Sequence, residues 1–75
     1  MSIDDMVGKA IDQMHEQQAI FPESDSYIAV ILVNGTHHAE ITITRKELEN
    51  NGPELHPLVK RLLIENGVTE DHIND

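Results

Sequence analysis

The residues best suited to chemistry lie in a predicted strand near the middle of the chain. His38 and Glu40 are two residues apart, so their side chains share one face of a strand. Pairing with the preceding strand brings Tyr27 to the same face. An imidazole, a carboxylate and a phenol together are typical of acid–base catalysis. Because no nucleophile or pocket is predicted beside them, an ordinary solvated strand face is the favoured interpretation.

Five histidines suggest a metal site, but their spacing argues against one. His37 and His38 are adjacent on a strand and point to opposite faces. The other three lack the spacing of a chelating pair: His15, His56 and His72. The chain has no cysteine, which excludes thiolate ligands and disulfides. We therefore expect no catalytic residue, no cofactor and no metal. A small metal-binding or acid–base site on this strand face remains an alternative.

The chain is strongly acidic, with a net charge of −9 and an isoelectric point near 4.7. This charge argues against direct binding of nucleic acid, which requires clustered lysine and arginine. The first 25 residues carry six acidic side chains against one lysine, a balance of −5. An acidic surface is predicted at Asp5, Asp12, Glu16, Glu23 and Asp25. Such a surface either solubilises the protein or imitates a nucleic-acid backbone toward a basic partner.

A β-hairpin must position the central residues, because Asn34-Gly35 is a strong signal for a two-residue turn. Strands are predicted at 27–33 and 36–43. In a regular hairpin of this kind, Ile31 faces His38. The face expected beneath the helices then carries Ile28, Val30, Leu32, Ala39 and Ile41, with His37 at its rim. The second face carries Tyr27, Ala29, Ile31 and Val33 beside Thr36, His38, Glu40 and Thr42.

Helices are predicted on both sides of the hairpin in the sequence. Apolar residues at helical spacing predict a helix over 3–18, with Ser2 as its cap. A capping box at Thr44 begins a short helix over 45–50, and a helix over 57–66 ends at Gly67. Residues 69–75 are expected to form a frayed tail. Whether Ala19–Phe21 adds a third strand stays open at this point.

These elements predict a single α+β domain over residues 1–75, an antiparallel hairpin packed against an N-terminal and a C-terminal helix. The first strand is apolar on both faces, which is typical of a central strand. We therefore expect a homodimer in which strand 27–33 pairs with its symmetry mate. That pairing gives a four-stranded antiparallel sheet with strand 36–43 at each edge.

The favoured function is a small, acidic, non-enzymatic protein-interaction module, an adaptor or inhibitor of the kind that phages and mobile elements encode. Its partner-binding residues are predicted to be Tyr27, Ala29, Ile31, Val33, His38 and Glu40. The first alternative is a nucleic-acid mimic that inhibits a DNA- or RNA-handling enzyme. No apolar run is long enough to cross a membrane. We expect a cytoplasmic protein with a protein partner, a second copy of itself, or both.

Overall fold

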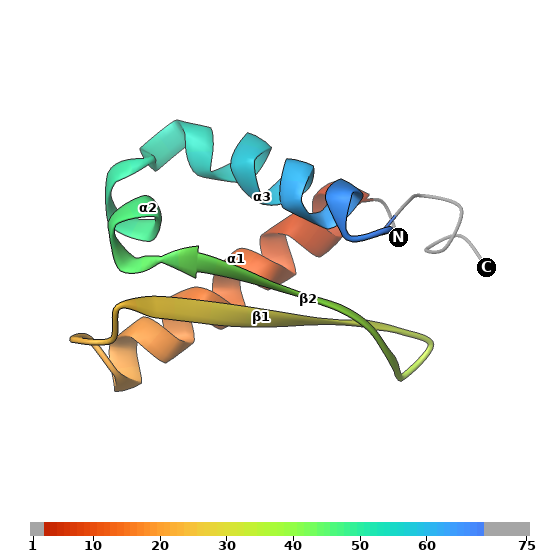
Figure 1. Cartoon of the computed structure of the whole chain (residues 1–75), viewed down its shortest axis with the longest axis horizontal. Coiled ribbons are helices and arrows are strands. Elements are labelled where there is room, and N and C mark those ends of the chain that lie inside the picture. The colour runs from red at the N-terminus through yellow and green to blue at the C-terminus, as the bar shows by residue number, and fades with distance from the viewer. Residues whose placement is uncertain (1–2, 69–75) are drawn as a thin grey trace.

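The chain forms an antiparallel hairpin with helices before and after it, which confirms the predicted α+β class. The computed structural model describes residues 3–68. Their order is α1 (Ile3–Ile20), β1 (Ser26–Val33), β2 (Thr36–Thr44), α2 (Arg45–Asn50), a 3-10 turn η1 (Gly52–Glu54) and α3 (Leu55–Glu65). In Figure 1, α1 passes behind the hairpin and α3 lies above β2. The predicted Ser2 cap and the tail at 69–75 lie outside the described residues.

Helix α1 extends two residues beyond the predicted end at residue 18. The N–H of Phe21 donates to the carbonyl of Gln17 at 2.7 Å, which continues the helical hydrogen bonding to the chain's exit from α1. Ala19 and Ile20 are therefore helical, and residues 19–21 do not form a third strand. The residues buried by α1 follow the predicted helical spacing: Ile3, Met6, Val7, Ala10 and Met14.

The capping box at Thr44 and the stop at Gly67 are confirmed, whereas α3 begins at Leu55, two residues before the predicted start at 57. The Thr44 hydroxyl accepts from the N–H of Glu47 at 3.1 Å, and the Glu47 carboxylate accepts from the N–H of Thr44 at 2.9 Å. This capping box begins α2 at residue 45. At the end of α3, Gly67 has a φ of 85°. The N–H of Val68 then returns to the carbonyl of Leu63 at 2.9 Å, which is the closing bond of a Schellman motif.

The hairpin contains a β-bulge that a regular two-residue turn does not predict. Asn34 and Gly35 have φ values of 53° and 78°, as a type I′ turn requires. Val33 pairs with Thr36 and Leu32 with His37, but Ile31 pairs with Ala39. His38 is therefore the extra residue on β2. Beyond the bulge, every residue of β1 faces a partner one position later than predicted.

This shift makes the predicted assignment of the β1 faces wrong. Tyr27, Ala29 and Ile31 lie beneath the helices, each 2% exposed or less. Ile28, Val30 and Leu32 are the exposed set. The bulge brings Tyr27 to the core face, where the aromatic ring is buried and its hydroxyl donates to the carbonyl of Phe21 at 2.7 Å. Burying an aromatic side chain removes more apolar surface from water than burying an aliphatic one, which favours the shifted register.

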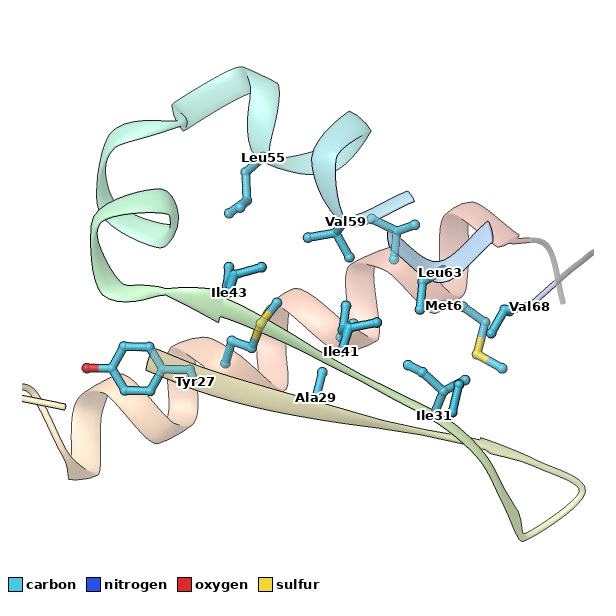
Figure 2. Packing of buried hydrophobic residues seen from close by; sticks show 14 of the residues in the cluster. Met6, Tyr27, Ala29, Ile31, Ile41, Ile43, Leu55, Val59, Leu63 and Val68 are labelled. Atoms are coloured by element: carbon cyan, nitrogen blue, oxygen red, sulfur yellow. The ribbon is translucent and has the colours of Figure 1, made fainter. Parts of the chain in front are cut away.

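The core lies between the hairpin, α1 and α3 (Figure 2). Leu55, Val59 and Leu63 of α3 are spaced by four residues and point toward Ile41 and Ile43. The two strands contribute Tyr27, Ala29, Ile31, Ala39, Ile41 and Ile43. The prediction that Ala39 and Ile41 face the helices is confirmed, and Ile43 is buried on the same side. All helical cover that the structure describes thus lies on one side of the sheet.

Candidate interaction surface

The other side of the hairpin carries a stripe of exposed aliphatic side chains. We call this side the open face; its residues are Ile28, Val30 and Leu32 of β1 and His37, Glu40 and Thr42 of β2. Ile28 is 44% exposed, Val30 36% and Leu32 53%. The three alternate along one strand, so their side chains lie in line on one face. An exposed aliphatic residue is ordinary by itself, but three in line form an apolar patch that is typical of a binding surface.

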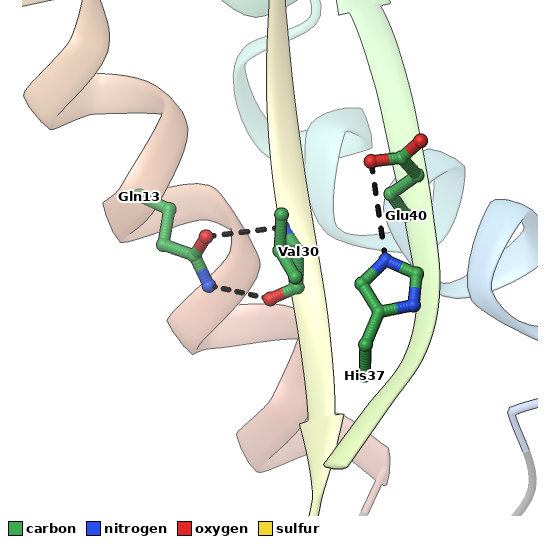
Figure 3. A network of polar contacts seen from close by, with 4 residues as sticks. All are labelled: Gln13, Val30, His37 and Glu40. Atoms are coloured by element: carbon green, nitrogen blue, oxygen red, sulfur yellow. Dashed lines mark hydrogen bonds and ion pairs between the residues drawn. The ribbon is translucent and has the colours of Figure 1, made fainter. Parts of the chain in front are cut away.

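Each aliphatic residue of the open face has a polar neighbour across the ladder. Thr42 lies opposite Ile28, Glu40 opposite Val30, and His37 opposite Leu32. The Nε2 atom of His37 lies 4.0 Å from the Glu40 carboxylate (Figure 3). The regular hairpin register predicts His38 beside Glu40 on this face and His37 on the other. The bulge reverses this assignment. His38 is an extra residue between His37 and Ala39, so His37 shares the open face with Glu40.

The predicted acid–base residues are not brought together. The Nε2 atom of His38 lies 3.2 Å from the carbonyl oxygen of Gly67, after the end of α3. Tyr27 is buried on the helix side of the hairpin, while Glu40 is exposed on the open face. The phenol and the carboxylate therefore lie on opposite sides of the sheet. Glu40 lies instead beside His37, and both of these side chains are exposed.

The predicted partner-binding residues are likewise divided between the two sides of the hairpin. Tyr27, Ala29 and Ile31 are covered by the helices of the same chain. Val33 is half-buried against the core, and His38 is half-buried. Glu40 alone of the predicted set is exposed on the open face. The aliphatic residues that the fold leaves accessible are instead their sequence neighbours in β1.

The outer edge of β1 is occupied by two glutamine side chains of α1. The Gln13 amide donates to the carbonyl of Val30 at 3.0 Å and accepts from the N–H of Val30 at 3.1 Å (Figure 3). Gln17 accepts from the N–H of Ile28 at 3.1 Å and donates to its carbonyl. Each glutamine thus replaces one residue of a neighbouring strand. The spacing of the two glutamines along α1 matches the spacing of Ile28 and Val30 along β1. Four residues of helix rise about 6 Å, and two residues of strand rise about 6.8 Å.

The contact of the two glutamines with the β1 edge is a feature of this surface that was not predicted from the sequence. Their spacing of four residues places both on one side of α1, beside the buried positions Ala10 and Met14. That spacing is visible in the sequence and indicates a shared helix side. It does not indicate that the side meets a strand edge, because α1 and β1 come together only in the tertiary structure.

A groove between α1 and β1 begins where the glutamines end. Its volume is about 250 Å³, and it is lined by Met6, Lys9, Gln13, Val30, Ile31 and Leu32. Lys9 lies one helical turn before Gln13 and lines this groove together with Leu32. The groove adjoins the apolar stripe through Val30 and Leu32. It adds a concave region beside the open face.

The predicted acidic surface is exposed in the structure. Asp5, Asp12 and Glu16 are exposed on α1, and their spacings of seven and four residues place them along one line of the helix. Glu23 and Asp25 are exposed on the connector between α1 and β1. Asp4 lies 3.4 Å from the Lys60 ammonium and 3.8 Å from His56, so this carboxylate faces α3. The acidic surface and the open face are distinct surfaces.

Residues 3–68 hold neither a metal-binding cluster nor a membrane-spanning helix. No cluster of three or more histidine, aspartate or glutamate side chains in this part of the chain is arranged to hold a metal ion. Among its helices, none has the length and apolar content needed to cross a membrane. Comparison of the chain with family models, curated proteins and solved structures finds no match.

Proposed function

We propose that the protein is a non-enzymatic interaction module that binds a protein partner through the open face. The observation that carries this proposal is the stripe of Ile28, Val30 and Leu32, which no described helix covers. Hydrophobic contact energy scales with the apolar area removed from water, and interface energy concentrates in a few well-buried side chains. Three aligned aliphatic side chains supply such a centre, with Thr42, Glu40 and His37 as a polar rim.

The charge of the protein indicates the chemistry of the partner. Glu40 flanks the apolar stripe on β2, and the chain carries a net charge of −9. A complementary surface therefore presents aliphatic or aromatic side chains to β1 and a lysine or arginine to Glu40. Such a protein acts as an adaptor if the partner's own site stays accessible, and as an inhibitor if binding covers it.

Replacing one residue of the stripe by a polar residue is expected to weaken partner capture. Leu32→Gln removes an aliphatic side chain from the open face, and Ile64→Gln makes the matched change on α3, where Ile64 is 52% exposed. We expect Leu32→Gln to reduce the partner's affinity about tenfold or more, as at an interface centre. Ile64→Gln is expected to leave affinity within about twofold. Quantitative capture of the partner on immobilised wild-type and variant protein measures both.

The same capture experiment separates the open face from the acidic surface. Asp12→Lys with Glu16→Lys reverses two charges on α1 and leaves the apolar stripe intact. Under the open-face proposal this double variant retains the partner at moderate salt. If Leu32→Gln captures the partner normally while the charge-reversed variant loses it, the open face is not the binding site. That outcome favours the nucleic-acid mimic, whose binding rests on the exposed carboxylates.

A further inference from the structure

We propose that the outer edge of β2 pairs with β2 of a second copy of this chain. The product is a four-stranded antiparallel sheet in the order β1-β2-β2′-β1′. This differs from the dimer expected from the sequence, in which strand one is central. The inference concerns an edge of the sheet and does not depend on the proposed function of its open face.

The edge of β1 is unsuitable for this pairing because the outward hydrogen-bonding groups at its centre are already used. The outward N–H and C=O groups of Ile28 and Val30 bind the amides of Gln17 and Gln13. A second copy at this edge would have to displace both side chains and move α1. A protected edge of this kind is a usual device against strand pairing.

The outer edge of β2 carries backbone N–H and C=O groups that point away from β1. In an antiparallel pair, residues opposite each other turn their backbone groups either both inward or both outward. Thr42 lies opposite Ile28 and Glu40 opposite Val30, so their N–H and C=O groups point away from β1. Within residues 3–68, no strand pairs with this edge, and no hydrogen bond to those four groups is found.

Both ends of this edge are bounded, which limits the pairing to residues 40–42. At one end the N–H of Thr44 donates to the Glu47 carboxylate at 2.9 Å. At the other end the His38 ring contacts Gly67 beside the bulge. The segment between these contacts has Ile41 at its centre. A two-fold axis at Ile41 therefore uses all four outward groups of each copy.

That register also avoids opposing like charges. With Ile41 opposite Ile41 of the second copy, each Glu40 lies opposite a Thr42. Moving the register to set Glu40 opposite Glu40 would place two carboxylates directly across the ladder, which destabilises a sheet. Moving it the other way would set Glu40 opposite Thr44, whose N–H is already bound to Glu47. The register centred at Ile41 is the one that satisfies hydrogen bonding and charge together.

The distribution of charge favours the same edge. Residues 1–25 hold a balance of −5, and their helix lies along β1 rather than β2. Pairing through β2 therefore keeps the most acidic parts of the two copies on the outer sides of the assembly. Because both copies are still negative overall, added salt is expected to strengthen the dimer. A partner held by charge on the open face would show the opposite response.

A proline at position 42 tests the pairing. Thr42→Pro removes one outward N–H that β1 does not use, a position where an edge strand tolerates proline. Thr42→Ala keeps the N–H and serves as the control. Sedimentation equilibrium is expected to give about twice the 8.4 kDa chain mass for wild type and Thr42→Ala. We expect Thr42→Pro to weaken association about tenfold or more while circular dichroism shows it folded.

A measurement on the wild-type chain keeps the proposal testable if the proline variant fails to fold. Residues opposite each other without mutual hydrogen bonds bring their Cα atoms to about 4.5 Å, so their Hα atoms are close. An isotope-filtered NOE experiment on mixed labelled and unlabelled chains is expected to show an intermolecular Hα contact from Ile41 to Ile41. A monomer at NMR concentrations overturns the proposal. A dimer without the Ile41 contact, or one that a folded Thr42→Pro variant retains, also overturns it.

Discussion

Replacing Ile31 by alanine is expected to lower the free energy of unfolding by about 2–5 kcal/mol, whereas the same change at Leu32 is expected to lower it by about 0.5 kcal/mol or less. The two residues are neighbours with similar side-chain volume. Ile31 is 2% exposed and packs in the core, while Leu32 is 53% exposed on the open face. The alanine at 31 leaves a cavity between the hairpin and the helices, and the alanine at 32 leaves none. Urea denaturation followed by circular dichroism measures both values.

The opposite ranking would contradict the bulged register. In the regular register that the turn alone predicts, Leu32 lies beneath the helices and Ile31 does not. Leu32→Ala would then be the costly substitution. Val30→Ala gives a third comparison. Val30 is 36% exposed, so its loss of unfolding free energy is expected to be small, like that of Leu32→Ala and unlike that of Ile31→Ala.

Removing both strand-edge glutamines is expected to cost about 2–4 kcal/mol of stability. Gln13→Ala with Gln17→Ala deletes four hydrogen bonds to the backbone of β1. Each such bond contributes about 0.5–1.5 kcal/mol net, and water can replace part of it at this exposed edge. The N–H groups of Ile28 and Val30 lose their acceptors, so their hydrogen exchange should accelerate well beyond that of the core amides. Denaturation and NMR-detected exchange test the two effects together.

Gln18 supplies the matched control for this variant. Its amide donates to the Glu49 carboxylate at 3.0 Å and does not touch the strand edge. Gln18→Ala is therefore expected to change stability by about 0.5 kcal/mol or less and to leave the exchange of Ile28 and Val30 unchanged. If the double variant behaves like Gln18→Ala, the glutamines do not protect the β1 edge. A protected β1 edge would then no longer favour association through β2.

Local signals were sufficient to predict much of this fold. Asn34-Gly35 predicted the hairpin because both residues accept a positive φ, which a type I′ turn demands. Thr44 and Glu47 predicted the start of α2 because a capping box needs only residues three positions apart. Gly67 predicted the end of α3 because glycine accepts the positive φ that follows a helix C-terminus. Each of these features depends only on residues within about four positions of one another.

The register of the hairpin could not be predicted in this way. Strand β1 is apolar at every position from Tyr27 to Val33, so its sequence does not indicate which face is buried. A one-residue slip exchanges the two faces completely. The choice depends on how Tyr27 and Ile31 pack against α1 and α3, which is a tertiary effect. The same slip decides that His37, and not His38, shares a face with Glu40.

Because the register differs from the predicted one, the residues of the exposed face differ too. The face is still aliphatic on β1 and polar on β2. The sequence predicted one conventional core face and a second face that is aliphatic on β1 and polar on β2. The structure keeps this contrast and replaces Tyr27, Ala29 and Ile31 by Ile28, Val30 and Leu32 as the aliphatic half. The strand edges add a feature that no single strand reveals, because Gln13 and Gln17 come from a different element.

The hairpin register, on which the open face and both edges depend, is tested most directly by NOEs between Hα atoms across the strands. The bulged register predicts contacts from Val30 to Glu40 and from Ile28 to Thr42, the pairs whose backbone groups point outward. The regular two-residue register instead predicts contacts from Val30 to Ala39 and from Ile28 to Ile41. Observing the first set supports the exposed stripe and the open β2 edge. Observing the second set would place Ile28, Val30 and Leu32 in the core and contradict both.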